Sequence, residues 1–152
     1  MNPTTANKNT IVQETAINAK AERIFDALTS PEELLRWWRV TGKFQAAEVE
    51  CDLRPGGKWR MLVADASGTR TATVVYGEYL EISRPSLLVY TWVREGENWP
   101  ATTVRWELKE IDGVTAVHLT HTGFASESHR DRNSGWPMIF EVLEAYVRIS
   151  DS

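Results

Sequence analysis

The chain has 152 residues, of which 42% are hydrophobic and 25% are charged, and this is the composition of one ordinary globular domain. The formal net charge of −4 argues against a nucleic-acid-binding protein, because such proteins normally carry a clustered basic excess. No apolar run approaches the roughly 20 residues of a membrane span, and the one cysteine, Cys51, excludes an internal disulfide and fits a reducing cytoplasm.

The N-terminal part predicts a strand and two short helices after a polar tail. Residues 1–9 are expected to be a flexible tail that precedes a single domain at residues 10–149. Apolar and polar residues alternate over Thr10–Ile17, which predicts a strand. Asn18 is expected to cap the first helix. Ser30 begins the second, because a proline and two glutamates follow it.

The central part of the chain has the period-two pattern of strands separated by turn sequences. Further strands are predicted at residues 49–53, 58–63, 72–82, 87–93, 103–111 and 114–122. The Asp112-Gly113 pair between the last two strands predicts a tight hairpin. The polar and charged segment that follows, residues 125–133, is expected to be a loop.

The C-terminal segment has the clearest helical pattern. Its large apolar residues recur at helical spacing and form one stripe, made by Trp136, Ile139, Phe140, Leu143, Tyr146 and Val147. A stripe of this size is too apolar to face water, so the helix is expected to lie against the apolar face of the sheet. The sequence therefore predicts an α+β fold with its helices on one side of an antiparallel sheet.

Seven short motifs, in this order along the chain, resemble those of a known family. They are residues 22–32 (ERIFDALTSPE), Trp37-Trp38, residues 52–57 (DLRPGG), 77–82 (GEYLEI), 88–92 (LVYTW), 120–124 (THTGF) and Gly135-Trp136. They resemble the activator of heat-shock protein 90 ATPase homologues, within the START-like (SRPBCC, helix-grip) superfamily, from about Thr10 to Val147. The resemblance implies a curved antiparallel sheet of six to seven strands that wraps around the terminal helix and leaves a deep apolar cavity. It does not decide the function, because this superfamily includes carriers, enzymes, drug-sequestering proteins and chaperone regulators.

Large aromatic side chains come from most of the elements around the implied cavity. Flat rings around such a sheet leave a lined pocket, whereas branched aliphatic side chains fill the space. The expected ligand-binding residues are Trp38, Trp59, Met61, Tyr79, Tyr90, Trp92, Trp106, His121, Phe124, Trp136 and Phe140. For any one of them the alternative is a place in the core. The inward or outward facing of Tyr79 and Tyr90 stays open, because a strand bulge would reverse it.

His121 is the polar candidate, because its strand parity places it with Val117 and Leu119 on the cavity side. It is expected to orient a ligand or to act as an acid or base, and the alternative is a core histidine satisfied by a protein oxygen. His118 has the opposite parity and His129 lies in the polar segment, so the histidines do not converge on a metal site. No catalytic residue, metal or cofactor is assigned.

These observations favour a cytoplasmic binding protein for a small hydrophobic ligand, aromatic ligands included, that is a monomer or a weak homodimer. The resemblance implies an alternative with a chaperone partner, in which the chain regulates the heat-shock protein 90 ATPase. The eukaryotic activators carry a further chaperone-binding domain, for which 152 residues leave no room. A cyclase- or hydrolase-like enzyme using the same cavity is the second, less favoured alternative, and it needs another polar group close to His121.

Overall fold

The computed structural model describes residues 10–65 and 72–151, so the expected tail at residues 1–9 lies outside the described part of the chain. One antiparallel sheet dominates the fold, with the strand order β1-β8-β7-β6-β5-β4-β3-β2. The strands are β1 (Thr10–Ile17), β2 (Arg39–Val40), β3 (Phe44–Cys51), β4 (Lys58–Asp65), β5 (Ala72–Ser83), β6 (Leu87–Arg94), β7 (Thr102–Ile111) and β8 (Val114–Thr122). From β2 to β8 each strand pairs with the next one along the chain, and β1 closes the series by pairing with β8.

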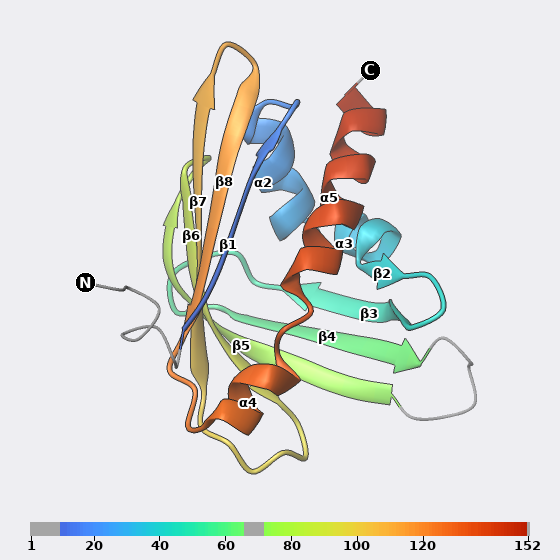
Figure 1. The fold of residues 1–152 in the computed structure, drawn as a ribbon, viewed down its shortest axis with the longest axis vertical. Coiled ribbons are helices and arrows are strands. Elements are labelled where there is room, and N and C mark those ends of the chain that lie inside the picture. Colours follow the sequence, from blue (N-terminus) through green and yellow to red (C-terminus); the bar gives the residue numbers. More distant parts are fainter. Residues whose placement is uncertain (1–9, 66–71, 152) are drawn as a thin grey trace.

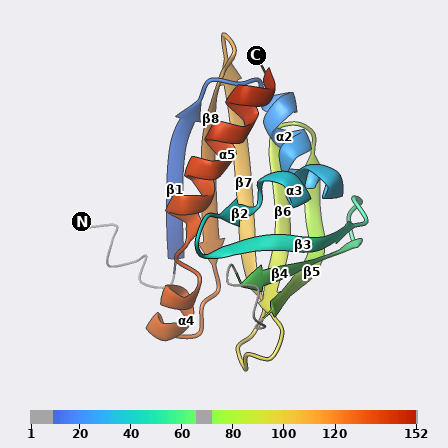
Figure 2. The ribbon, with the colours of Figure 1, turned by 90° about the vertical axis from the view of Figure 1, so that its right-hand side faces the viewer.

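The sheet curves around the helices, which lie on its concave side (Figures 1 and 2). The helices are α2 (Ala21–Thr29), α3 (Pro31–Trp37), α4 (Glu127–Arg132) and α5 (Trp136–Asp151). In both views α2 and α3 lie beside α5, and α4 lies at its N-terminal end. The predicted α+β class, the two short helices after the first strand and the long C-terminal helix are thereby confirmed.

Three elements differ from the prediction. The strand expected at residues 49–53 begins and ends earlier, as β3 (Phe44–Cys51). The sheet has eight strands rather than six to seven, because Arg39–Val40 pairs with β3 and adds the short strand β2. The segment expected to be a loop contains α4. Ser126 caps this helix by accepting a hydrogen bond from the backbone N–H of His129 (3.1 Å), and the polar composition of the segment hides this start signal.

The two short helices begin in different ways. The side chain of Ser30 accepts a hydrogen bond from the backbone N–H of Glu33 (3.4 Å), so the predicted cap of α3 is confirmed. The prediction that Asn18 caps α2 is wrong, because the N-cap position is Lys20 and its side chain makes no capping bond. The first backbone N–H of α2, at Ala21, instead donates to the carboxylate of Glu110 on β7 (2.8 Å), a partner that is distant in sequence.

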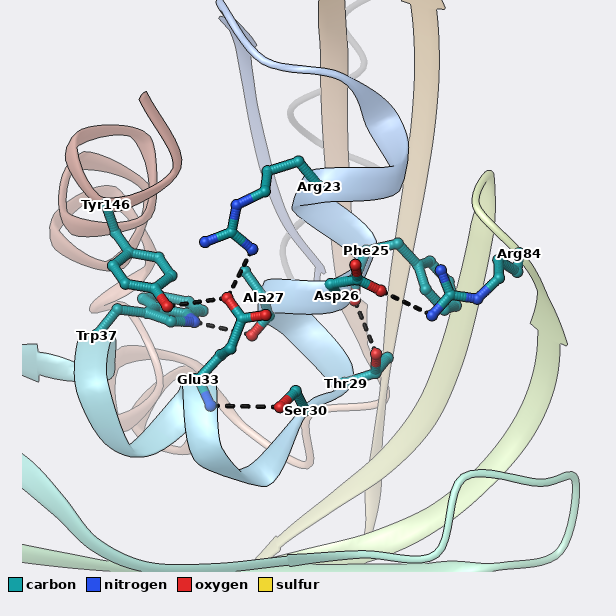
Figure 3. Close-up of polar contacts among 10 residues, drawn as sticks. All are labelled: Arg23, Phe25, Asp26, Ala27, Thr29, Ser30, Glu33, Trp37, Arg84 and Tyr146. Carbon is teal, nitrogen blue, oxygen red and sulfur yellow. Dashed lines mark hydrogen bonds and ion pairs between the residues drawn. The ribbon is translucent and has the colours of Figure 1, made fainter. Parts of the chain in front are cut away.

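A polar cluster joins α2, α3 and α5 (Figure 3). The carboxylate of Glu33 accepts hydrogen bonds from Arg23 of α2 (2.6 Å) and from the hydroxyl of Tyr146 of α5 (2.8 Å). The ring N–H of Trp37 donates to a backbone carbonyl of α2 (2.8 Å), and its ring stacks near that of Tyr146. These contacts fix α3 against its neighbours and thereby position Trp38, the residue that follows α3.

The apolar stripe of α5 faces the sheet, as predicted. Leu143 and Val147 are completely buried, and Trp136, Ile139 and Phe140 are nearly so. The ring of Phe140 stacks on Trp106 of β7, with 5.4 Å between centroids and 9° between ring planes. No helix in the described residues is both long and apolar enough to span a membrane.

Regular strand alternation decides which aromatic residues of β5 and β6 face the helices. Tyr79 shares the buried face of β5 with Val75 and Gly77, and Tyr90 shares that of β6 with Leu88 and Trp92. The register between the two strands shifts only after Tyr79, so Glu81 is exposed and Ile82 packs against the core. At Gly77 the two strands come so close that a Cβ atom would overlap the carbonyl oxygen of Thr91. Both Tyr79 and Tyr90 therefore face inward, which answers the question that the sequence left open.

Candidate functional site

A cavity of about 390 Å³ lies between the N-terminal part of α5 and the sheet. Its lining comes from α5, from the end of α4, from the segments that follow α3 and α4, and from strands β3 to β6. The apolar part of the lining consists of Trp38, Phe44, Val63, Ala64, Val75, Trp92, Trp136 and Ile139. The volume lies within the range of roughly 300–1,000 Å³ that is usual for small-molecule sites.

Three indole rings form one wall of the cavity. The ring centroids of Trp38 and Trp92 are 6.2 Å apart, those of Trp38 and Trp136 are 6.1 Å apart, and those of Trp92 and Trp136 are 5.8 Å apart. The ring N–H of Trp92 donates to Asn133 Oδ1 (3.1 Å), and the ring N–H of Trp136 donates to His121 Nδ1 (3.1 Å). Because the protein itself satisfies these two N–H groups, both rings are held in place without a ligand.

A chain of hydrogen bonds fixes His121 behind this wall. Its Nδ1 accepts from Trp136, its Nε2 lies 2.7 Å from Thr102 Oγ1, and Thr102 Oγ1 donates in turn to the backbone carbonyl of Trp92 (3.1 Å). The direction of these donors assigns the ring proton to Nε2. Burial, with smaller contributions from the positive charges of His129 and Arg94, lowers the pKa of His121 to about 3. His121 is therefore neutral at physiological pH, and both of its nitrogens are occupied.

A second, much smaller cavity of about 20 Å³ lies on the other side of Trp38 and Trp92. It is lined by four further predicted ligand-binding residues, Trp59, Met61, Tyr79 and Tyr90. A space of this size holds about one water molecule. The four side chains therefore support the tryptophan wall from behind.

The chain matches the family model described as Activator of Hsp90 ATPase homolog 1-like protein over residues 18–148. The chain belongs to this family. The match covers α2 to α5 and all strands except β1, so it includes every residue of the cavity lining. No curated protein sequence is significantly similar to the chain.

Solved structures share the fold along most of its length. A protein of Chromobacterium violaceum is 23% identical with a TM-score of 0.81, over 91% of this chain and 97% of its own. An AHSA1-like protein from Aeromonas hydrophila is 20% identical with a TM-score of 0.76, over 93% of each chain. An HSP90 activator from Plasmodium falciparum is 25% identical with a TM-score of 0.64, over 84% of this chain and 87% of its own. The helix-grip fold inferred from the sequence motifs is thereby confirmed.

Within this family fold, the predicted ligand-binding residues separate into three groups. Trp38, Trp92 and Trp136 line the large cavity, and four others surround the small one. The remaining four line neither cavity and are buried in the core: Trp106, His121, Phe124 and Phe140. The ring of Trp106 packs between Phe140 and Trp136, and that of Phe124 lies 4.5 Å from His121. The structure therefore brings only part of the predicted set to one site.

Several lining residues are absent from the predicted set, and the most informative are polar. Arg94, Arg132, Lys43 and Asp65 all contribute to the cavity. The sequence does contain a signal for Arg94, because this residue lies two positions after Trp92 and therefore on the same face of the strand. For Arg132 there was none, since its segment was expected to be a loop. Among the described residues, no group of three or more His, Cys, Asp or Glu side chains is placed to bind a metal ion.

The stability of the fold is expected to decrease as the pH falls from 7 to 5. The folded state keeps His121 neutral down to about pH 3, whereas an unfolded histidine takes up a proton near pH 6.5. The unfolded state therefore binds more protons between these values, and the free energy of unfolding falls by about 2 kcal/mol from this group over that interval. Urea unfolding at both pH values measures the effect.

His121→Gln isolates this contribution. Glutamine keeps one donor and one acceptor for Thr102 and Trp136, but it does not titrate. Burial also lowers the pKa of His129, so some pH dependence is expected to persist. His118→Gln is the matched control, because it removes a half-exposed imidazole from the outer face of β8. Equal pH dependence in the wild type and His121→Gln would contradict the assignment.

Proposed function

We propose that the chain binds a small hydrophobic ligand, aromatic ligands included, in the large cavity between α5 and the sheet. The observation that carries this proposal is the wall of three indole rings around a cavity of about 390 Å³. Ring faces offer a large contact area and favourable stacking to a flat apolar molecule. The one cysteine, Cys51, supports the cytoplasm as the place where the protein acts.

The arrangement of the wall supports binding in a second way. The rings of Trp92 and Trp136 are already fixed by hydrogen bonds to Asn133 and His121. A ligand that enters therefore does not have to order these side chains, and a preformed site loses less free energy on binding than a flexible one. Both nitrogens of His121 are engaged within the protein, so the histidine supports the wall, and the binding hypothesis is preferred to an acid–base enzyme.

Titration with N-phenyl-1-naphthylamine tests the proposal. This neutral aromatic probe becomes fluorescent in an apolar site, and we expect saturable binding together with a higher melting temperature, because the probe binds only the folded state. A linear, non-saturating signal without a change in melting temperature would contradict the proposal.

Val63→Trp is designed to fill the cavity from β4. Val63 is half-buried and lines the cavity, so the larger ring occupies the space that the probe needs. We expect the Val63→Trp variant to bind the probe at least about tenfold more weakly than the wild type. The matched control is Leu62→Trp on the opposite face of the same strand, where an equally large ring should change the affinity less than about twofold.

Chaperone regulation is the second candidate, favoured by the likeness to the HSP90 activator from Plasmodium falciparum and by the family to which the chain belongs. It predicts that the protein increases the ATPase rate of a purified Hsp90. Val63→Trp separates the two candidates. If Val63→Trp still stimulates the Hsp90 ATPase, the regulation belongs to a surface other than the cavity. If the wild-type protein leaves the ATPase rate unchanged, chaperone regulation is excluded.

A further inference from the structure

One end of the large cavity is basic, and this end determines what kind of ligand the cavity suits. Arg94 at the end of β6 and Arg132 at the end of α4 both line the cavity. Arg94 Nε donates to Asn133 Oδ1 (3.0 Å), and its guanidinium carbon lies 5.8 Å from the ring centroid of Trp92. The guanidinium is thereby held beside the tryptophan wall, and within the described part of the chain its other N–H groups donate no further hydrogen bond.

The two arginines are only partly neutralised. Arg132 Nε forms an ion pair with Glu97 Oε2 (3.0 Å), but among the described residues no carboxylate forms an ion pair with Arg94. Burial and the positive charge of Arg132 lower the pKa of Arg94 to about 10, and the negative charge of Glu97 acts in the opposite direction. One carboxylate, Glu97, therefore serves two guanidinium groups, and a bound anion would supply a second negative charge.

The other charged lining residues lie at a different end of the cavity. Asp65 pairs in the sheet with Phe44, the residue next to Lys43, so this carboxylate and this ammonium group come from neighbouring positions at the β3–β4 edge. Arg94 instead pairs with Val75 on β5 and lies next to α4 through Asn133. The two arginines therefore lie at the α4 end of the cavity, and Lys43 and Asp65 lie at the β3–β4 end.

We infer that the ligand is an amphipathic organic acid, in which a flat apolar body lies against Trp38, Trp92 and Trp136 and a carboxylate is bound by Arg94 and Arg132. This inference rests on the proposed function and narrows it from apolar molecules in general to carboxylic acids. A guanidinium matches a carboxylate with two parallel N–H···O bonds, so Arg94 supplies orientation as well as charge.

A pair of probes of nearly equal shape tests the charge alone. 2-Naphthoate and 2-naphthamide share the naphthalene body, but only the former carries a negative charge at neutral pH. We expect wild-type protein to bind 2-naphthoate at least about tenfold more tightly in calorimetric titration at low salt. The preference should decrease as salt is added, because the charged end of the cavity is partly exposed.

Arg94→Gln is expected to reduce this preference to less than about threefold. Arg132→Gln, at a more exposed position, provides a second test if Arg94→Gln does not fold. Arg105→Gln on the outer face of β7 is the matched control, because it changes the net charge by the same amount and should keep the preference.

The outcomes separate this inference from the proposed function. Equal affinity for both probes would overturn the organic-acid inference and leave apolar binding intact. A preference for 2-naphthoate that survives both Arg94→Gln and Arg132→Gln would overturn the assignment of the two arginines. Failure of both probes to bind, together with failure of N-phenyl-1-naphthylamine, would overturn the proposed function and this inference with it.

Discussion

Gly77→Ala is expected to destabilise the fold by at least about 3 kcal/mol. A Cβ atom at this position would overlap the carbonyl oxygen of Thr91 and approach Trp59 Nε1 to 2.8 Å. Both neighbours are fixed, since Trp59 Nε1 donates to that same carbonyl (3.2 Å) and Thr91 Oγ1 accepts from the N–H of Glu78 (2.9 Å). The methyl group therefore has to separate β5 from β6 next to the buried pair Tyr79 and Tyr90.

Chemical denaturation of the Gly77→Ala variant, compared with that of the control variant Gly135→Ala, measures this effect. A Cβ atom at Gly135 would meet only the end of the Met138 side chain, at 3.9 Å, so the control is expected to lose less than about 1 kcal/mol. Equal midpoints for the two variants would show that β5 and β6 can separate at Gly77 without loss of stability. Their close approach would then not depend on glycine.

Leu143→Ala is expected to reduce the free energy of unfolding by about 2–5 kcal/mol, which is the range for removing a large aliphatic side chain from a core. Leu143 has no exposed surface and lies at the centre of the stripe that α5 presents to the sheet. The vacated space is enclosed by the helix and the curved sheet, so the surrounding side chains can only partly fill it.

Glu141→Ala is the control on the same helix. Glu141 is exposed and lies off the stripe, so its removal should change stability by less than about 0.5 kcal/mol. Denaturant titrations of both variants give the comparison. A Leu143→Ala variant as stable as Glu141→Ala would mean that α5 does not pack against the sheet through this face.

Most of the fold could be predicted because its signals are local. The alternation in Thr10–Ile17, the Ser30 cap and the α5 stripe each specify an element within a few residues, and the structure confirms all three. The start of α2 could not be predicted, since its first N–H is satisfied by Glu110 from another strand. The short strand β2 was missed because two residues carry no periodic pattern.

The site was harder to predict, because aromatic residues that look alike in sequence occupy three different environments. Trp92 and Trp106 have the same strand pattern, yet Trp92 borders the cavity, whereas the ring of Trp106 is covered by Phe140. Their roles depend on how far the sheet curves at each strand, and this is a property of the whole assembly. The basic end could not be predicted from apolar periodicity, because a charged residue at the end of a strand usually faces solvent, although Arg94 lies on the same face as Trp92.

The hydrogen bonds behind the wall couple two rings that are far apart in sequence. Trp136 is joined to the carbonyl of Trp92 through His121 and Thr102, and the ring of Trp92 is joined through Asn133 to the backbone of α4. Swinging either ring aside breaks a buried hydrogen bond, at a cost of about 1–3 kcal/mol. The hydrogen bonds therefore make this part of the tryptophan wall rigid, and a molecule that could enter the cavity only by displacing one of these two rings would have to offset this cost.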